Sequence, residues 1–336
     1  MKNVSKKISI YQTVIFALLL GAVALRTVAL FLDYDPASGY FGAKALINIG
    51  NGLLISGVLL SLTSLITLKS GKGFVASFDT AATYIPSGVV AAALAFIGAH
   101  LFRNIVKLPE KLLSKESLTD VKVLFMLALS ALAVIAVGAF LLNALSTKRS
   151  DASRAGFYVA AVVFLMLYSA YLYFSTRLPI NAPTKTVDQM AYMVSAIFFL
   201  YETRISLDRP VWHAYVAFGM SAALLTAYSA LPSLVYYFAK GVMISDSIYE
   251  CVLTLALFIF ICARLILLTE LQSDEHCPAA RLAEIQAENR SAARLAHKEA
   301  LACANNDNEE NVEDGEPSNY SMDIDDTATD STEVTE

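Results

Sequence analysis

The chain has 336 residues, of which 56% are hydrophobic and only 16% are charged, and its mean hydropathy is +0.55. A soluble domain carries about 45–50% apolar and about 25% charged residues, so this composition indicates a protein of the lipid bilayer. It excludes a disordered, collagen-like or disulfide-stapled chain. The net charge of −5, without a basic segment interleaved with aromatic residues, also excludes a nucleic-acid binder.

Apolar blocks of helical length fill most of the chain before residue 268. A run of about 20 apolar residues crosses a hydrocarbon core of roughly 30 Å as a helix. We therefore predict an all-α fold, a polytopic integral membrane bundle of eight transmembrane helices. The predicted spans are residues 8–32, 45–68, 81–101, 121–145, 155–175, 187–207, 211–238 and 244–268.

The first span resembles a signal peptide at its start, where lysines precede the apolar run and Ala22-Val23-Ala24 resembles a cleavage site. The run continues to Leu32, however, beyond the 7–15 residues of a typical signal core. We expect an uncleaved first helix.

Two further patterns bear on helix packing. Ala91, Ala95 and Ala99 form a small-residue stripe in the third span, which predicts that another helix approaches closely there. Pro86 and Pro232 interrupt the third and seventh spans, near-equivalent positions of two four-helix halves. Interrupted helices in corresponding halves are typical of transporters, so a four-plus-four repeat is one hypothesis.

Few ionisable side chains fall within the spans, and each costs about 2.5–3.5 kcal/mol near the bilayer centre without a partner or an aqueous cavity. Arg26 and Glu250 lie at equal depth inside one face, and Glu202 and Arg264 lie near the opposite face. Matched depth and opposite sign predict the ion pairs Arg26–Glu250 and Glu202–Arg264, with the first and sixth helices beside the eighth. Alternatively, the two arginines extend to the headgroups, or the charges serve transport or signalling.

His100 lies toward the same face as Arg26 and Glu250, as do the tyrosines that end the seventh span. Interfacial anchoring explains most of the tyrosine pattern, and a ligand pocket, if the bundle has one, is expected at this face. No metalloprotease, Gly-x-Ser-x-Gly or complete phosphate-loop pattern occurs, so no catalytic residue, metal or cofactor is predicted. An intramembrane enzyme would have only His100, Glu250 and Arg26 as candidate groups.

The composition changes after the last span. Residues 278–304 are rich in Ala, Glu, Arg and Leu, which predicts a soluble amphipathic helix whose short heptad pattern only weakly suggests a coiled coil. From Leu301 onward there is no Lys or Arg and 12 of the 30 acidic residues; the remainder has 25 basic against 18 acidic residues, a balance of +7. Residues 305–336 are expected to be a disordered acidic tail.

Eight spans place both termini on one side, and Arg264 with the basic residues that follow it favours the cytoplasm. We expect a plasma-membrane protein that acts as a sensor, regulator or scaffold, in which a protein partner binds the C-terminal helix and acidic tail. The alternative is a secondary transporter of a small solute. A polar cavity that reaches Glu250 or Glu202 would favour transport, whereas a dry interior would favour sensing or scaffolding.

Overall fold

The structure is a computed structural model that describes residues 2–36, 38–67, 81–106, 121–145, 152–174, 179, 181–207, 211–245 and 247–273. The predicted helix at 278–304 and the predicted tail at 305–336 lie outside these residues. Within them the fold is helical. Its eight helices are α1 (Lys2–Asp33), α2 (Lys44–Thr67), α3 (Ala81–Val106), α4 (Val121–Leu145), α5 (Ala152–Phe174), α6 (Pro183–Ser206), α7 (Trp212–Lys240) and α8 (Ile248–Ser273).

Seven of the eight helices in the described part are long and apolar enough to cross a membrane. The exception is α6, which overlaps the predicted span 187–207. It carries Lys185, Asp188, Glu202 and Arg204, which lower its hydropathy. Lys185 and Glu202 are buried, and Lys185 donates to the Tyr173 carbonyl at 3.2 Å, whereas Arg204 is exposed. Two of the four charged groups of α6 thus lie inside the bundle, where neighbouring helices supply partners.

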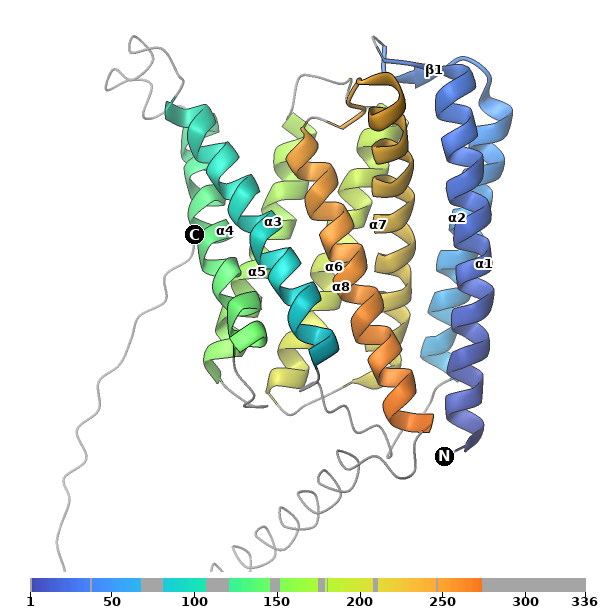
Figure 1. Cartoon of the computed structure of the whole chain (residues 1–336), viewed down its shortest axis with the longest axis vertical. Helices are drawn as coiled ribbons and strands as arrows, with labels where there is room; N and C mark the ends of the chain where they lie inside the picture. The colour runs from blue at the N-terminus through green and yellow to red at the C-terminus, as the bar shows by residue number, and fades with distance from the viewer. Residues whose placement is uncertain are drawn as a thin grey trace, which may run out of the picture. The chain divides into compact units, whose positions relative to one another are not determined.

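A short hairpin follows α1 and was not predicted. Strand β1 (Tyr34–Asp35) pairs antiparallel with β2 (Tyr40–Phe41). Gly39 closes the turn with a φ of 76°, a conformation that glycine adopts without strain, and its N–H donates to the Asp35 carbonyl at 2.8 Å. In Figure 1 the hairpin lies where α1 ends and α8 begins. We call this the hairpin end, and the other the opposite end.

The helices form a ring with one pair attached to it. Each helix from α3 to α8 packs against the next, and α8 packs against α3, which closes a ring of six. The pair α1 and α2 packs on α7 from outside the ring (Figure 1). Helix α7 is therefore covered by α1, α2, α6 and α8, and it is the most buried of the seven apolar helices.

This arrangement does not repeat between the two halves of the chain. In the second half, α6 packs along α7, whereas the corresponding helices of the first half, α2 and α3, are not packed against each other over their described residues. The prolines at 86 and 232 do lie inside α3 and α7. The packing nevertheless gives no support to the four-plus-four repeat.

Helices α3 and α4 approach closely, but not through the alanine stripe predicted for α3. Ala95 and Ala99 are exposed. The contact is made by Gly98, where an added Cβ would lie only 3.0 Å from the Cβ of Ala133 on α4. The stripe was misassigned because small residues occur on several faces of this helix, and spacing alone does not show which face meets the neighbour.

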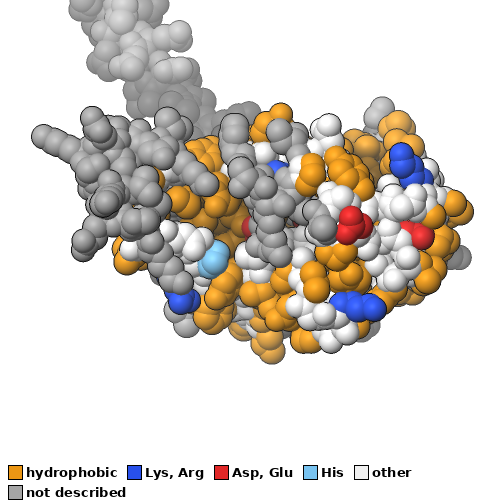
Figure 2. Space-filling model, turned by 90° about the horizontal axis from the view of Figure 1, so that it is seen from above, with side chains coloured by type: hydrophobic (Ala, Val, Ile, Leu, Met, Phe, Trp, Pro, Cys, Tyr) orange, Lys and Arg blue, Asp and Glu red, His pale blue; other side chains and the backbone are white. Residues whose placement is uncertain are grey.

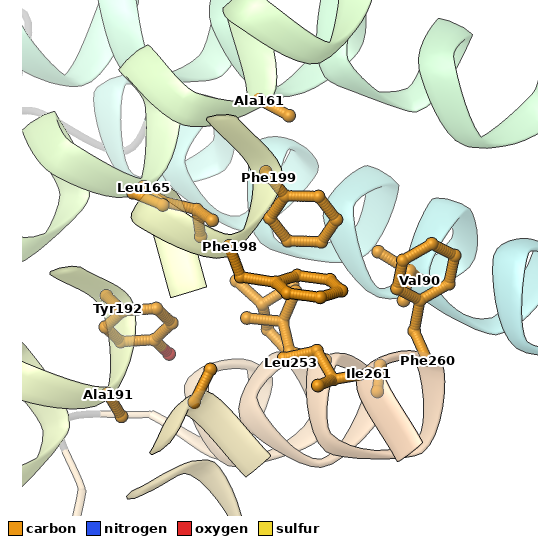
Figure 3. Packing of buried hydrophobic residues seen from close by; sticks show 14 of the residues in the cluster. Val90, Ala161, Leu165, Ala191, Tyr192, Phe198, Phe199, Leu253, Phe260 and Ile261 are labelled. Carbon is orange, nitrogen blue, oxygen red and sulfur yellow. The ribbon is translucent and has the colours of Figure 1, made fainter. Parts of the chain in front are cut away.

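Aromatic rings fill the centre of the six-helix ring. Phe140 of α4, Phe199 of α6 and Phe260 of α8 are almost fully buried, with centroids 5.4 to 5.6 Å apart, and we call them the aromatic trio. Figure 3 shows Phe199 and Phe260 among apolar side chains from α3, α5, α6 and α8. Phe140 meets the other two rings edge to face, an arrangement that is favourable beyond the burial of area. The middle of the ring is therefore closed by side chains.

Candidate functional site

An ion pair lies one helical turn from the aromatic trio toward the opposite end. Arg264 Nε donates to Glu202 Oε1 at 2.8 Å, and Nη2 donates to Oε2 at 2.7 Å. The Tyr215 hydroxyl also donates to Oε1, at 2.7 Å. Glu202 is 1% exposed and Arg264 is 6% exposed. The bidentate hydrogen bonds from Arg264 and the further bond from the Tyr215 hydroxyl compensate both buried charges, as a buried ion pair requires.

This is the Glu202–Arg264 pair predicted from depth and sign, and it joins α6 to α8. Tyr215 was not predicted to take part. It lies in the first turn of α7, where its hydroxyl reaches Glu202 of α6. A tyrosine just after the loop that follows a buried acid is a weak signal for such a bond. Its hydroxyl suits a buried site because it needs a partner there.

Arg26 lies toward the hairpin end in very different surroundings. It is 1% exposed, and its guanidinium carbon lies 4.5 Å from the centroid of the Tyr228 ring on α7. Both Nε and Nη1 are buried, and neither has a hydrogen-bond partner within the described part of the chain. The predicted pair with Glu250 is wrong, because no hydrogen bond or ion pair to that carboxylate is present at Arg26. The cation instead packs on an aromatic face.

Glu250 binds hydroxyl groups from two other helices. The Tyr168 hydroxyl of α5 donates to its Oε1 at 2.8 Å, and the Tyr192 hydroxyl of α6 donates to its carbonyl at 3.1 Å. Tyr192 also contacts the Thr254 hydroxyl at 2.9 Å. Glu250 stands in the first turn of α8, where the helix dipole favours a negative charge. The Tyr168 hydroxyl and the helix dipole stabilise the buried carboxylate without Arg26, whereas Tyr192 binds only the backbone carbonyl of Glu250.

Tyr228 connects Arg26 to α2 and lies beside a contact between α6 and α7. Its hydroxyl donates to Asn51 Oδ1 at 2.7 Å. Gly50 makes room for it, since an added Cβ would lie 3.3 Å from that hydroxyl. The next residue, Ser229, donates to Asp188 of α6. Pro232 has no N–H to donate to the Tyr228 carbonyl, so one backbone hydrogen bond of α7 is missing at this level.

A small apolar group covers the hairpin end beyond Arg26, and we call it the capping cluster. In it, Tyr34 packs edge-on against Tyr236 at 6.0 Å and at a tilt against Phe41 at 5.3 Å. Burial raises the pKa of the Tyr34 phenol above its ordinary value, so this side chain is neutral at physiological pH. The members are Ala29, Leu30, Tyr34, Phe41, Ile47, Tyr236 and Ile244.

His100 lies beside α8, as its predicted depth allows. Its ring is 4.6 Å from that of Tyr249, and Asn104 Nδ2 lies 3.1 Å from its Nε2. Seen from the hairpin end, the described surface shows charged side chains singly among hydrophobic ones (Figure 2). The described residues contain no group of three or more His, Cys, Asp or Glu side chains placed to hold a metal ion.

Sequence reasoning missed four polar groups of this end of the bundle. The structure brings Asn51 to Tyr228, Asp188 to Ser229, and Tyr168 and Tyr192 to Glu250. None of the four was among the predicted site residues. The available signal was an acid one turn into a helix that also carries Lys185 and Glu202. Compared with known protein families, curated proteins and solved structures, the chain matches none of them.

Proposed function

We propose that the protein is a multi-pass integral membrane protein of the plasma membrane that works as a sensor or regulator, with its C-terminal segment as the cytoplasmic output. The seven apolar helices support membrane insertion. Helix α6 suits the same setting along its middle, where its exposed side chains are apolar and Lys185 and Glu202 are buried. These exposed residues are Met190, Met193, Ile197 and Leu200.

The observation that carries the sensing role is the closed centre of the ring. The aromatic trio fills the middle, and the Glu202–Arg264 pair lies satisfied beside it. A transporter needs a polar route through the bundle, whereas a sensor needs only a change in helix packing that reaches the far side. A ring whose centre is filled by packed side chains favours the second.

The acidic tail is the proposed output. From Leu301 onward the chain has 12 acidic residues and no basic ones, so a basic protein surface is the complementary partner. The segment 278–304 would link the bundle to that tail. This role requires both termini to lie in the cytoplasm.

A truncation tests the proposal. A host strain that lacks the protein would be complemented with the full chain or with residues 1–277, and its genome-wide expression profile compared with wild type. We expect the full chain to restore the profile and the truncation to fail, although both reach the membrane in equal amounts. Full restoration by the truncation would overturn the proposal.

Secondary transport of a small solute is the second candidate function. The buried Arg26 and the interruption of α7 at Pro232 favour it. Cysteines placed between the aromatic trio and the hairpin end, as Ala196→Cys and Ala256→Cys in a background without native cysteines, distinguish the two functions. Both positions are buried. A transporter exposes them to membrane-impermeant thiol reagents in turn from each side, whereas the sensor keeps them protected from both.

A further inference from the structure

Arg26 is a buried cation, two of whose nitrogens have no hydrogen-bond partner among the described residues. A guanidinium has five N–H donors that lie in its plane and no acceptor. The guanidinium carbon of Arg26 lies over the Tyr228 ring, 4.5 Å from its centroid, and the buried Nε and Nη1 are the nitrogens without a partner. Because these donors are buried, bulk water does not compensate them, and burying such a group without a partner is unfavourable.

The other buried arginine shows what Arg26 lacks. Arg264 uses Nε and Nη2 to hold both oxygens of the Glu202 carboxylate. Glu250 lies toward the same end as Arg26 but is bound by Tyr168, and Asp188 accepts from Ser229. Within the described residues, therefore, neither of these carboxylates accepts a hydrogen bond from Arg26 as Glu202 does from Arg264.

We propose that Arg26 is a binding site for an external anion with two or more oxygens on one centre, a carboxylate or a phosphate group. Two parallel N–H···O bonds to such a group match the guanidinium fork, and the charge assists both. The Tyr228 ring stays on the guanidinium face and holds its orientation. This inference deepens the proposed function, because treating the anion as the sensed ligand rests on that function, whereas the binding itself does not.

We place the entry to the site at the hairpin end, which is the nearer end of α1. Arg26 lies seven residues before Asp33, the last residue of α1, which places it about 10 Å inside that end at 1.5 Å per residue. The capping cluster lies between this level and the helix ends. The anion is either a free solute that enters past the hairpin or the headgroup of an anionic lipid that reaches in between helices. Both present the same oxygens.

Binding is measured on the full chain in nanodiscs of phosphatidylcholine. Inorganic phosphate and succinate are titrated as free anions, and nanodiscs with phosphatidylglycerol supply the headgroup. The readouts are the melting temperature and the side-chain Nε–H resonances of ¹⁵N-arginine. We expect a saturable rise in melting temperature with at least one probe, since a ligand that binds the folded state stabilises it. A shift of the Arg26 Nε–H signal should accompany it.

The variants identify the residue. Arg26→Lys keeps the charge but loses the fork, so we expect its affinity to fall about tenfold or more. Arg26→Met should abolish the response, and Arg204→Gln, which removes an exposed arginine, should leave it unchanged. A response to free anions in pure phosphatidylcholine identifies a solute, and a response only to phosphatidylglycerol identifies a lipid headgroup.

No saturable response with any probe, or an unchanged response in Arg26→Met, would overturn the site. Arg26→Met is not needed for the test if it does not fold. The Nε–H resonance that is missing in Arg26→Lys assigns the Arg26 signal of the wild-type chain. If that signal does not shift when an anion is added, the site is overturned equally. The site and the proposed function fail separately. Anion binding together with full restoration by residues 1–277 would keep the site and reject sensing through the tail.

Discussion

Arg26 and Arg264 are the two arginines buried in the described part of the bundle, and their surroundings differ in one respect that matters. Arg264 donates two hydrogen bonds to Glu202, and Tyr215 supplies a third to the same carboxylate. Arg26 packs on the ring of Tyr228, and its buried Nε and Nη1 have no partner among the described residues. One cation is hydrogen-bonded to a carboxylate within the bundle, whereas the other is not.

The difference separates a structural charge from a candidate functional one. A cation–π contact contributes about 2 kcal/mol when desolvated, whereas withdrawing an ion from water costs several kcal/mol. At Arg264 the bound carboxylate offsets the cost of withdrawing the cation from water. At Arg26 the aromatic ring alone does not offset this cost. Binding of an anion at the hairpin end is therefore expected to stabilise the protein, whereas the arginine at the opposite end already has its anion.

The largest expected effect comes from breaking the satisfied pair. Arg264→Met should lower the free energy of unfolding by about 3–5 kcal/mol, because it leaves the buried Glu202 carboxylate without its counter-ion. Denaturation by SDS in detergent micelles measures the change. The double variant Glu202→Gln/Arg264→Met should recover most of the loss. A single variant as stable as wild type would show that the pair contributes nothing.

Removing the third bond to the same carboxylate should have the next largest effect. Tyr215→Phe deletes a hydrogen bond to a charged group, which is worth about 1.5–3 kcal/mol. The same SDS denaturation reports the loss. Tyr201→Phe is the matched control on a ring that stacks against Phe218, and it should change stability less. Equal losses in the two variants would contradict the role given to the Tyr215 hydroxyl.

The unsatisfied arginine should respond in the opposite direction. Without added anion, Arg26→Met should change the free energy of unfolding by between zero and a gain of about 2 kcal/mol, because it removes an uncompensated buried charge and loses one cation–π contact. Arg26→Lys keeps a buried charge and should show no gain. A loss as large as that of Arg264→Met would mean that Arg26 already has a strong partner within the protein.

The smallest expected effect is at the ring beneath Arg26. Tyr228→Phe loses a neutral hydrogen bond to Asn51, worth about 0.5–1.5 kcal/mol, and keeps the aromatic face. Its melting temperature should fall slightly, and its response to anions should persist. A lost response would show that the hydroxyl, rather than the ring, orients the guanidinium.

Much of the bundle could be predicted from residue order alone. Helices occur at all eight predicted spans, since long apolar runs must satisfy their own backbone groups. The pairing of Glu202 with Arg264 followed from equal depth. The sequence reading overestimated the apolar character of the span at α6. Some of the polar residues of α6 are buried against neighbouring helices, and a composition count does not separate these from residues that face outward.

The candidate site was only partly predictable. The sequence placed Arg26, Glu250 and His100 toward one end, and the structure agrees on that level. It paired Arg26 with Glu250 because equal depth was the only criterion available. In the fold, Tyr168 of α5 reaches Glu250, and Tyr228 of α7 lies under Arg26. Asp188 and Asn51 come from helices whose rotation the sequence did not reveal.

By itself the sequence determined the depth of each charge, because every helical residue advances the chain by about 1.5 Å along the axis. It also determined that few charges lie within apolar helices and that the net charge of −5 comes from the acidic C-terminal segment. Only the tertiary structure decided which charges meet. Side-chain direction around a helix and the order of helices in the ring depend on packing between distant segments. Helix packing therefore brought Arg264 to Glu202 and left Arg26 without a hydrogen-bonded carboxylate, although Glu250 lies at a similar depth.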